Sequence, residues 1–223
     1  HRGLGHACAS VELGAKLCHV SHSLGSSLLL TVSPRLVAVN RTSRAFLVRQ
    51  RGGEHAVRLP PLGAMTRGGV PILWEDGAGA RQIQLRRPER GAEWSGGVPL
   101  GGVRFAALLA AGAELTLRLR NLETGRAEFP RLSLHHLDGR ATSVLLLQPE
   151  LPDAAPLLVH NRTCEPMRFG QLGVGARLTL GPHASAPYAL DEPTGAAQLE
   201  VAIGAVGGAS VCVRVGAPCR VHR

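Results

Sequence analysis

The side chains with the most reactive chemistry in this sequence are cysteines and histidines near the two ends of the chain. They form two groups, Cys8-x9-Cys18-His19 and Cys212-x6-Cys219-x2-His222. Thiolates and imidazoles bind metal ions such as zinc, but structural zinc sites hold paired ligands about two to four residues apart. Neither group has that spacing, so we expect no metal ion and no cofactor.

The sequence also lacks the patterns on which hydrolases and nucleotide-binding enzymes depend. It contains no Gly-x-Ser-x-Gly elbow that would expose a nucleophilic serine. The stretches GLGHAC and GVGARL lack the third glycine of a dinucleotide-binding turn. We therefore expect that the protein is not an enzyme.

One tripeptide occurs twice, as Asn40-Arg41-Thr42 and as Asn161-Arg162-Thr163. Each copy matches the Asn-x-Thr acceptor of N-glycosylation, which requires an exposed site in a secretory compartment. In a second interpretation the asparagine is structural, because a side-chain amide has two donors and an acceptor and can hold the backbone of a turn at the end of a strand. The apolar runs LVAV and LLVH that precede the two copies favour the structural interpretation.

The two tripeptides begin a longer internal repeat. Several residues recur behind both asparagines at the same offset and without a gap: Gln50 and Gln171, Leu59 and Leu180, and Pro61 and Pro182. After a short gap, ILWEDGAG aligns with YALDEPTG, which pairs Trp74 with Leu190 and Glu75 with Asp191. Agreement at a fixed offset is the signature of a duplicated structural unit.

Short apolar runs and alternating patterns predict β-strands along most of the chain. ELTLRLRNLETG has the clearest period of two, with Leu115, Leu117 and Leu119 on one face and polar side chains on the other. RLSLHHLDGRATSVLLLQPE predicts a hairpin around Asp138-Gly139. We expect an all-β fold built from tandem β-sandwich repeats.

The composition restricts both the core and the binding partners. Aromatic residues make up 3% of the 223 residues, so we expect Trp74 and Trp94 to be core anchors among aliphatic side chains. The formal charge is +9, but Lys16 is the only lysine and the arginines are scattered along the chain, so we expect no nucleic-acid partner. Five cysteines cannot all pair within one chain, which favours a reduced, intracellular protein.

The repeat resembles a known family. SLLLTVSPRLVAVNRTSRAFLVRQRGGEHAVRLPPLG, followed by PILWED and AEWSGGVPL, is similar to the repeats of the Vps13 adaptor-binding (VAB) domain, which belongs to large intermembrane lipid-transfer proteins. The first copy carries the family's landmarks as Ser33-Pro34-Arg35, Asn40, Gln50, Leu59-Pro60, Trp74-Glu75-Asp76 and Trp94-Ser95-Gly96. The second copy keeps Asn161, Gln171, Leu180 and Asp191-Glu192-Pro193, but it has Leu190 in place of tryptophan and no Trp-Ser-Gly segment.

The resemblance implies a division into an unassigned segment 1–27, a first VAB-like β repeat 28–148 and a second, incomplete repeat 149–223. It makes Asn40 and Asn161 the structural asparagines of the repeats, supported by Gln50, Trp74, Trp94 and Gln171, and it assigns no peptide-binding residue. It implies a β-sandwich for each repeat.

The resemblance also implies a function, which is a non-catalytic interaction module of a Vps13-like chain. Such a module binds adaptor proteins through short Pro-x-Pro peptides, which are extended and preordered. The adaptors target a cytoplasmic lipid-transfer and vacuolar protein sorting factor to organelle membranes and membrane contact sites, so that its association with membranes is indirect. The partners implied are these adaptors and the rest of the larger chain.

A second function hypothesis keeps the glycosylation interpretation. In this hypothesis the chain is a secreted or cell-surface β-sandwich with glycans on Asn40 and Asn161 and with disulfides among its cysteines. The two hypotheses place the asparagine side chains differently, since a glycan acceptor must be exposed whereas a turn-holding amide is buried.

Overall fold

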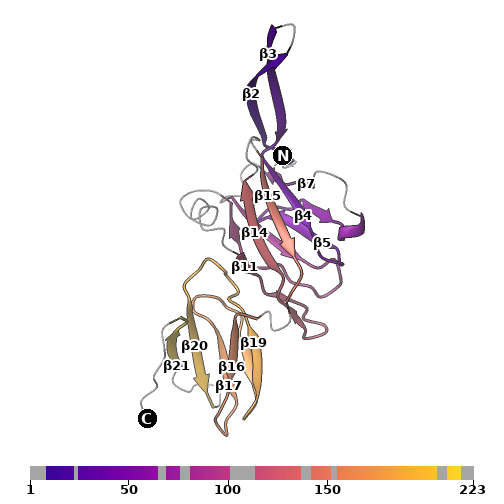
Figure 1. Ribbon diagram of the computed structural model, residues 1–223. Helices are drawn as coiled ribbons and strands as arrows, with labels where there is room; N and C mark the ends of the chain where they lie inside the picture. The colour runs from indigo at the N-terminus through magenta and orange to yellow at the C-terminus, as the bar shows by residue number, and fades with distance from the viewer. Residues whose placement is uncertain are drawn as a thin grey trace, which may run out of the picture.

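The computed structural model describes residues 9–22, 25–64, 69–75, 81–100, 114–136, 142–151, 155–204 and 210–216. Regular structure in these residues is β-strand, apart from the 3-10 turn η1 (Leu62–Ala64). The prediction of an all-β fold is confirmed. The strands form a projecting hairpin, a larger first unit and a smaller second unit, which follow one another along the molecule (Figure 1).

The first unit is a β-sandwich. One sheet has the order β10-β9-β5-β6, with β5 (Phe46–Gln50), β6 (Ala56–Leu59), β9 (Gln82–Arg86) and β10 (Val98–Pro99). The other has the order β11-β14-β15-β4-β7, with β4 (Leu36–Asn40), β7 (Val70–Pro71), β11 (Glu114–Thr116), β14 (Arg131–His136) and β15 (Ser143–Gln148). Alternate residues of both sheets meet in one buried and largely aliphatic core, as the period of two in a half-buried strand requires.

The hairpin predicted in this unit is confirmed. Strands β14 and β15 pair antiparallel, with Leu132 opposite Leu147 and Leu134 opposite Leu145. The predicted turn at Asp138-Gly139 lies outside the described residues. On its other edge β15 runs parallel to β4, which places Leu145 beside Ala38 and Leu147 beside Asn40.

The second unit has fewer strands in the same arrangement. The pair β16 (Leu157–His160) and β19 (Ser185–Tyr188) faces a sheet with the order β18-β17-β20-β21, formed by β17 (Met167–Gln171), β18 (Leu178–Leu180), β20 (Gln198–Ile203) and β21 (Ser210–Arg214). In the reverse order, β21-β20-β17-β18, this sheet corresponds strand by strand to β10-β9-β5-β6 of the first unit. The pair β16-β19 corresponds to β4-β7. In the part of the chain that the structure describes, no pair of strands matches β14 and β15. Descent of the two units from one repeat stays a prediction.

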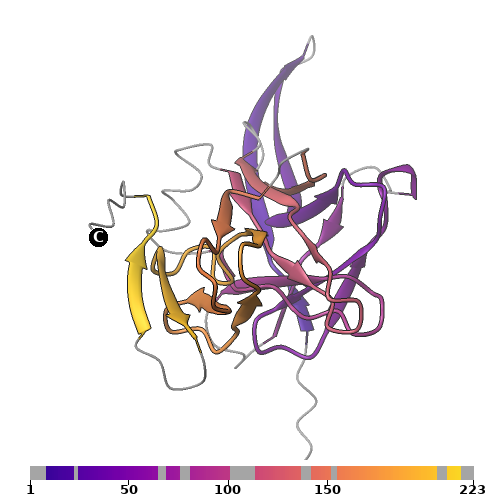
Figure 2. The ribbon, with the colours of Figure 1, turned by 90° about the horizontal axis from the view of Figure 1, so that it is seen from below.

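The first residues belong to two small sheets. Strand β1 (Ala9–Val11) pairs with β8 (Leu73–Glu75), so it joins the first unit. Strands β2 (Leu13–His22) and β3 (Gly25–Pro34) form a two-stranded hairpin that projects from the body in both views (Figures 1 and 2). The predicted domain boundary at residue 28 therefore falls inside a strand.

The clearest alternating segment is interrupted in the structure. It forms β11 and, after a break, β12 (Leu119–Arg120), which pairs with β13 (Ala127–Glu128). Leu117 and Leu119 are buried and Leu115 is partly buried against the same core, but Arg118 on the opposite face is also buried, with 6% of its surface exposed. The second unit covers that face.

Among the described residues, no helix has the length and apolar character needed to cross a membrane.

Candidate functional site

Asn40, the last residue of β4, is fully buried (0% exposed). Its Nδ2 donates hydrogen bonds to the carbonyl oxygens of Arg44 at 2.7 Å and Pro60 at 2.8 Å, and its Oδ1 accepts the N–H of Thr42 at 2.9 Å. These backbone groups lie where the chain leaves the strands, so no strand partner satisfies them. One amide therefore joins the loop after β4 to the end of β6.

Asn161 makes the same bonds at the end of β16, with 2% of its surface exposed. Its Nδ2 donates to the carbonyl oxygens of Glu165 at 2.8 Å and Gly181 at 2.9 Å, and its Oδ1 accepts the N–H of Thr163 at 3.1 Å. The threonine hydroxyl also takes part, because Thr163 Oγ1 donates to the carbonyl of Glu165 at 3.0 Å. Thr42 Oγ1 makes the equivalent bond to Arg44 at 2.9 Å, a role for threonine that the sequence interpretation missed.

This geometry bears on glycosylation at the two Asn-x-Thr sequences. A glycan is attached through Nδ2 of asparagine, and in both units that atom is buried and donates to backbone carbonyls. A sugar at either position would displace these bonds and open the turn. The folded structure therefore favours the structural interpretation of both asparagines.

Gln50 and Gln171 bind the backbone of equivalent segments in the two units. Gln50 Oε1 accepts the N–H of Glu75 at 2.7 Å, and Gln171 Oε1 accepts the N–H of Glu192 at 2.7 Å. Gln171 Nε2 also donates to the carbonyls of Glu192 and Ala196, each at 3.0 Å. By these bonds Glu75 corresponds to Glu192, one residue beyond the Asp191 that the sequence alignment pairs with it.

The carboxylate of Glu75 closes the loop between β5 and β6. It accepts the backbone N–H of His55 at 2.6 Å and of Glu54 at 3.1 Å, while 4% of its side chain is exposed. These two backbone donors hold the pKa of the Glu75 carboxyl below its ordinary value. The imidazole of His55, 3.1 Å away, acts in the same direction when it is protonated.

The two tryptophans have different roles. Trp74 is buried (7% exposed) in the core of the first unit, as predicted. Trp94 is only partly buried and lies outside that core, so its prediction as a core anchor is wrong. Its ring lies near the guanidinium groups of Arg49 and Arg86, 4.1 and 4.8 Å from the ring centroid, because those side chains point outward from β5 and β9.

The segment around Trp94 forms the joint between the two units. Ser95 fixes it to β9, since its Oγ accepts the N–H of Leu85 at 3.0 Å. A Cβ atom on Gly96 would lie 1.8 Å from the carbonyl oxygen of Asp191, so only glycine permits this approach of the two backbones. Beside it the N–H of Gly97 donates to Glu192 Oε2 at 3.0 Å.

Charged side chains complete the joint. Arg118 Nη1 of the first unit lies 2.9 Å from Asp191 Oδ1 of the second, with 3% and 12% of the two side chains exposed. The other carboxylate oxygen of Asp191 accepts the hydroxyl of Tyr188 at 2.8 Å. Arg51 adds an ion pair with Glu192 at 2.9 Å. Burial lowers the pKa of Arg118 and raises that of Tyr188, while Asp191 opposes the shift of Arg118 and adds to that of Tyr188.

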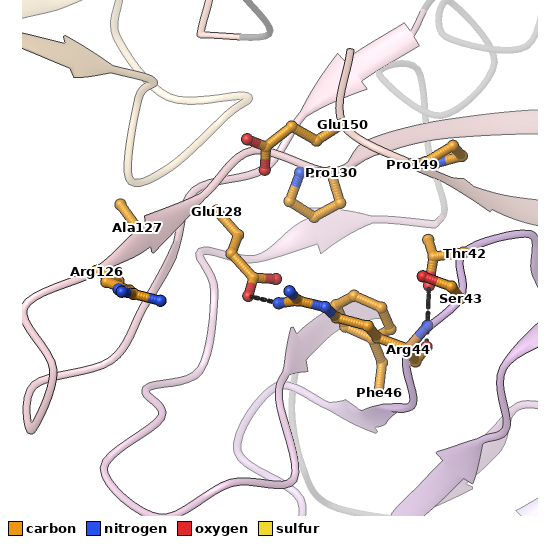
Figure 3. Close-up of a pocket in the computed structure, with 10 residues that line it drawn as sticks. All are labelled: Thr42, Ser43, Arg44, Phe46, Arg126, Ala127, Glu128, Pro130, Pro149 and Glu150. Carbon is orange, nitrogen blue, oxygen red and sulfur yellow. Dashed lines mark hydrogen bonds and ion pairs between the residues drawn. The ribbon is translucent and has the colours of Figure 1, made fainter. Parts of the chain in front are cut away.

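A hollow of about 430 Å³ lies beside the turn that Asn40 holds (Figure 3). Its rings come from Phe46, Pro130 and Pro149, and its remaining lining comes from residues 42–44, 126–128 and Glu150. Arg44 reaches toward Glu128, with a distance of 2.7 Å from Nη1 to Oε1. Residues 42–44 form one wall, so the Asn40 amide positions part of this surface.

The described residues hold no group of three or more His, Cys, Asp or Glu side chains that could bind a metal ion. Three cysteines that the structure describes, Cys18, Cys164 and Cys212, are free thiols, and Cys8 and Cys219 lie outside the described residues.

No protein-family model matches the chain, and no curated protein matches it.

Replacement of Asn40 by alanine tests the buried amide. We expect Asn40→Ala to lower the melting temperature by several degrees, because each buried backbone group left unsatisfied costs about 1–3 kcal/mol. Asn40→Asp should be at least as harmful, since a carboxylate cannot donate to the carbonyls of Arg44 and Pro60. Thermal unfolding followed by circular dichroism measures both effects.

Asn121→Ala is the matched control for this change. Its Nδ2 donates to Arg90 O, and its Oδ1 accepts the N–H groups of Glu123 and Thr124, all in an exposed setting. Water can replace those bonds, so we expect a smaller loss. Equal melting temperatures for Asn40→Ala and the unchanged chain would contradict the role given to Asn40.

The depressed pKa of Glu75 predicts a pH dependence of stability. A folded-state pKa below the unfolded value of about 4.3 adds stability that is complete above that value and is lost as the pH falls through the folded pKa. Glu75→Gln should flatten this part of the profile, measured by urea unfolding between about pH 3 and pH 6. Glu54→Gln, at an exposed neighbour, is the control. Parallel profiles for Glu75→Gln and the unchanged chain would refute the assignment.

The close approach at Gly96 predicts a steric effect at the joint. Gly96→Ala should separate the units there and weaken the pair Arg118 and Asp191, with a loss of several degrees in melting temperature. Gly63→Ala is the control, because a Cβ atom there meets nothing within 4 Å. If both variants have the same melting temperature as the unchanged chain, the joint does not depend on this glycine.

Proposed function

We propose that this chain is a non-catalytic protein-interaction module of a Vps13-like lipid-transfer protein. In this proposal it binds Pro-x-Pro peptides of adaptor proteins, which hold the larger protein at organelle membrane contact sites. The observation that carries the proposal is the hollow beside the Asn40 turn, with the rings of Phe46, Pro130 and Pro149 in its lining. The resemblance of the repeats to VAB repeats supports the proposal and supplies the class of partner.

The lining of the hollow suits an extended proline-containing segment. Such a segment presents pyrrolidine rings on its sides and leaves its backbone carbonyls without internal partners. Proline and aromatic rings in the hollow offer apolar contacts, while the guanidinium groups of Arg44 and Arg126 on the rim offer donors to carbonyl oxygens. Little ordering entropy is lost when a preformed polyproline helix binds, so a shallow surface is sufficient.

The Asn40 turn gives the hollow a fixed wall. Thr42 and Arg44 are held through Asn40 Oδ1 and Nδ2, and the backbone N–H of Arg44 is 3.2 Å from Thr42 Oγ1. On the opposite side Glu150 accepts the N–H of Phe129 at 2.9 Å. In this proposal the structural asparagine acts on binding indirectly, through the loop that it positions.

A synthetic Pro-x-Pro peptide titrated into the whole chain tests the proposal by calorimetry. We expect saturable binding, and we expect Ser43→Trp to weaken it at least about tenfold, because the indole would fill the hollow from its exposed rim. Leu122→Trp places the same side chain on an exposed position outside the lining and should bind normally. Absence of binding, or equal affinity for the Ser43→Trp variant, would refute a peptide site in this hollow.

A further inference from the structure

The β2–β3 hairpin presents an apolar face to solvent. Register places Leu17 opposite Leu30 and Ala15 opposite Val32, on the same face of the ribbon. More than half of the surface of each larger side chain is exposed, with values of 61% for Leu17, 60% for Leu30 and 54% for Val32. Both views show the ribbon standing clear of the two units (Figures 1 and 2). A continuous exposed apolar face of this kind marks an interaction surface.

The second unit has an open sheet edge, because one edge of β16 lacks a partner strand among the described residues. In the first unit the equivalent edge of β4 is occupied by β15. Matched residues that point away from the two cores also differ, since Val37, beside Val144 of β15, is 5% exposed whereas Leu158 on β16 is 61% exposed. Leu157 and Val159, which point toward the second core, are only partly buried.

The backbone of β16 is oriented to receive a strand on that edge. Asn161 donates its N–H to the carbonyl of Ala184, so the alternate residues Leu157 and Val159 bond toward β19. Leu158 and His160 therefore direct their N–H and C=O groups to the open side. The same alternation occurs in the first unit. Val37 and Val39 are the counterparts of Leu158 and His160, and Arg41, two residues further on, donates its N–H to the carbonyl of Leu147 on β15.

The apolar residues of the β2–β3 hairpin follow the same pattern as those of the β14–β15 hairpin, which covers the core of the first unit. When Pro34 is aligned with Pro149, Leu30 and Val32 fall on Leu145 and Leu147, which are buried in that core. Their cross-strand partners also correspond, since Leu134 and Leu132 pair with Leu145 and Leu147 as Leu17 and Ala15 pair with Leu30 and Val32. Each hairpin also directly precedes the first strand of a unit, β4 or β16.

We propose that the β2–β3 hairpin of one copy of this chain docks on the second unit of another copy. In the complex, β3 runs parallel to β16 in the register that β15 has on β4, which places Leu29 beside Leu158 and Leu30 beside Val159. The apolar face of the hairpin then covers the partly exposed core of the second unit. Donor and acceptor surfaces lie on different parts of one chain, so the contact is head to tail and can extend into chains of more than two copies.

The proposal is independent of the hollow beside the Asn40 turn, because none of the residues that line that hollow belongs to β2, β3 or β16. Light scattering coupled to size-exclusion chromatography tests it on the whole chain. We expect a mean mass above the 23.4 kDa of one copy that rises with concentration. A mass that stays at one copy at every concentration would overturn the proposal.

Two variants separate the donor from the acceptor. Leu30→Glu places a charge on the apolar face of the hairpin and should abolish association, while Thr31→Glu places the same charge on the opposite face and should leave it intact. Leu158→Pro removes an N–H from the open edge of β16 without removing a bond to β19, and it should also abolish association. Equal effects of Leu30→Glu and Thr31→Glu would overturn the assignment of the face.

A mixture of the two inactive variants is the decisive experiment. The Leu30→Glu chain keeps an intact acceptor edge and the Leu158→Pro chain keeps an intact hairpin, so an equimolar mixture should form a complex of two copies and no larger species. Recovery in the mixture also shows that each variant remains folded at the surface it contributes. Continued association of Leu158→Pro alone would mean that hairpins pack on one another, and it would refute the proposed contact.

Discussion

A buried asparagine amide at the end of the first strand is the interaction on which each unit depends. The chain must leave β4 or β16, turn, and enter the opposite sheet, and the backbone groups of that turn cannot pair within a strand. Asn40 and Asn161 satisfy them with both donors and the acceptor of one side chain. An aspartate has no donor, and a serine has too few atoms to reach two segments, so asparagine is the residue type that the position requires. The loop held in this way then forms a wall of the hollow in the first unit.

The joint between the units uses parts of the sequence that have no evident role within one unit. Gly96 lets the two backbones approach, Gly97 donates to Glu192, and Arg118 pairs with Asp191 where little water reaches them. Removing one partner of such a pair would leave a buried charge uncompensated, which costs more than the intact pair contributes. Arg118 and Asp191 therefore depend on each other at the contact between the two units.

Much of the fold was predictable because alternation and turn residues are local signals. The strands around Asn40 and the hairpin of β14 and β15 follow from short patterns, and the buried position of Trp74 follows from the scarcity of aromatic residues. Two of the failures of sequence reasoning share one cause, which is that a pattern identifies the face of a strand but not what covers that face. Arg118 lies on a polar face that the second unit buries, and Trp94 stacks against arginines that point away from the core. The hollow was not predictable either, since its lining comes from three segments far apart in the sequence.

The apolar face of the β2–β3 hairpin and the open edge of β16 lack the charged side chains that usually protect exposed surfaces of these kinds. Exposed sheet edges in isolated domains are commonly protected by lysine, by inward-pointing charges or by bulges. The open edge of β16 has none of these along Leu157–His160, and the only lysine of the chain, Lys16, lies on the face of the hairpin opposite to Leu17 and Leu30. An apolar face without a charged residue and an edge without protection both carry a cost in solubility. Docking of the hairpin of one copy on the β16 edge of another would cover both surfaces.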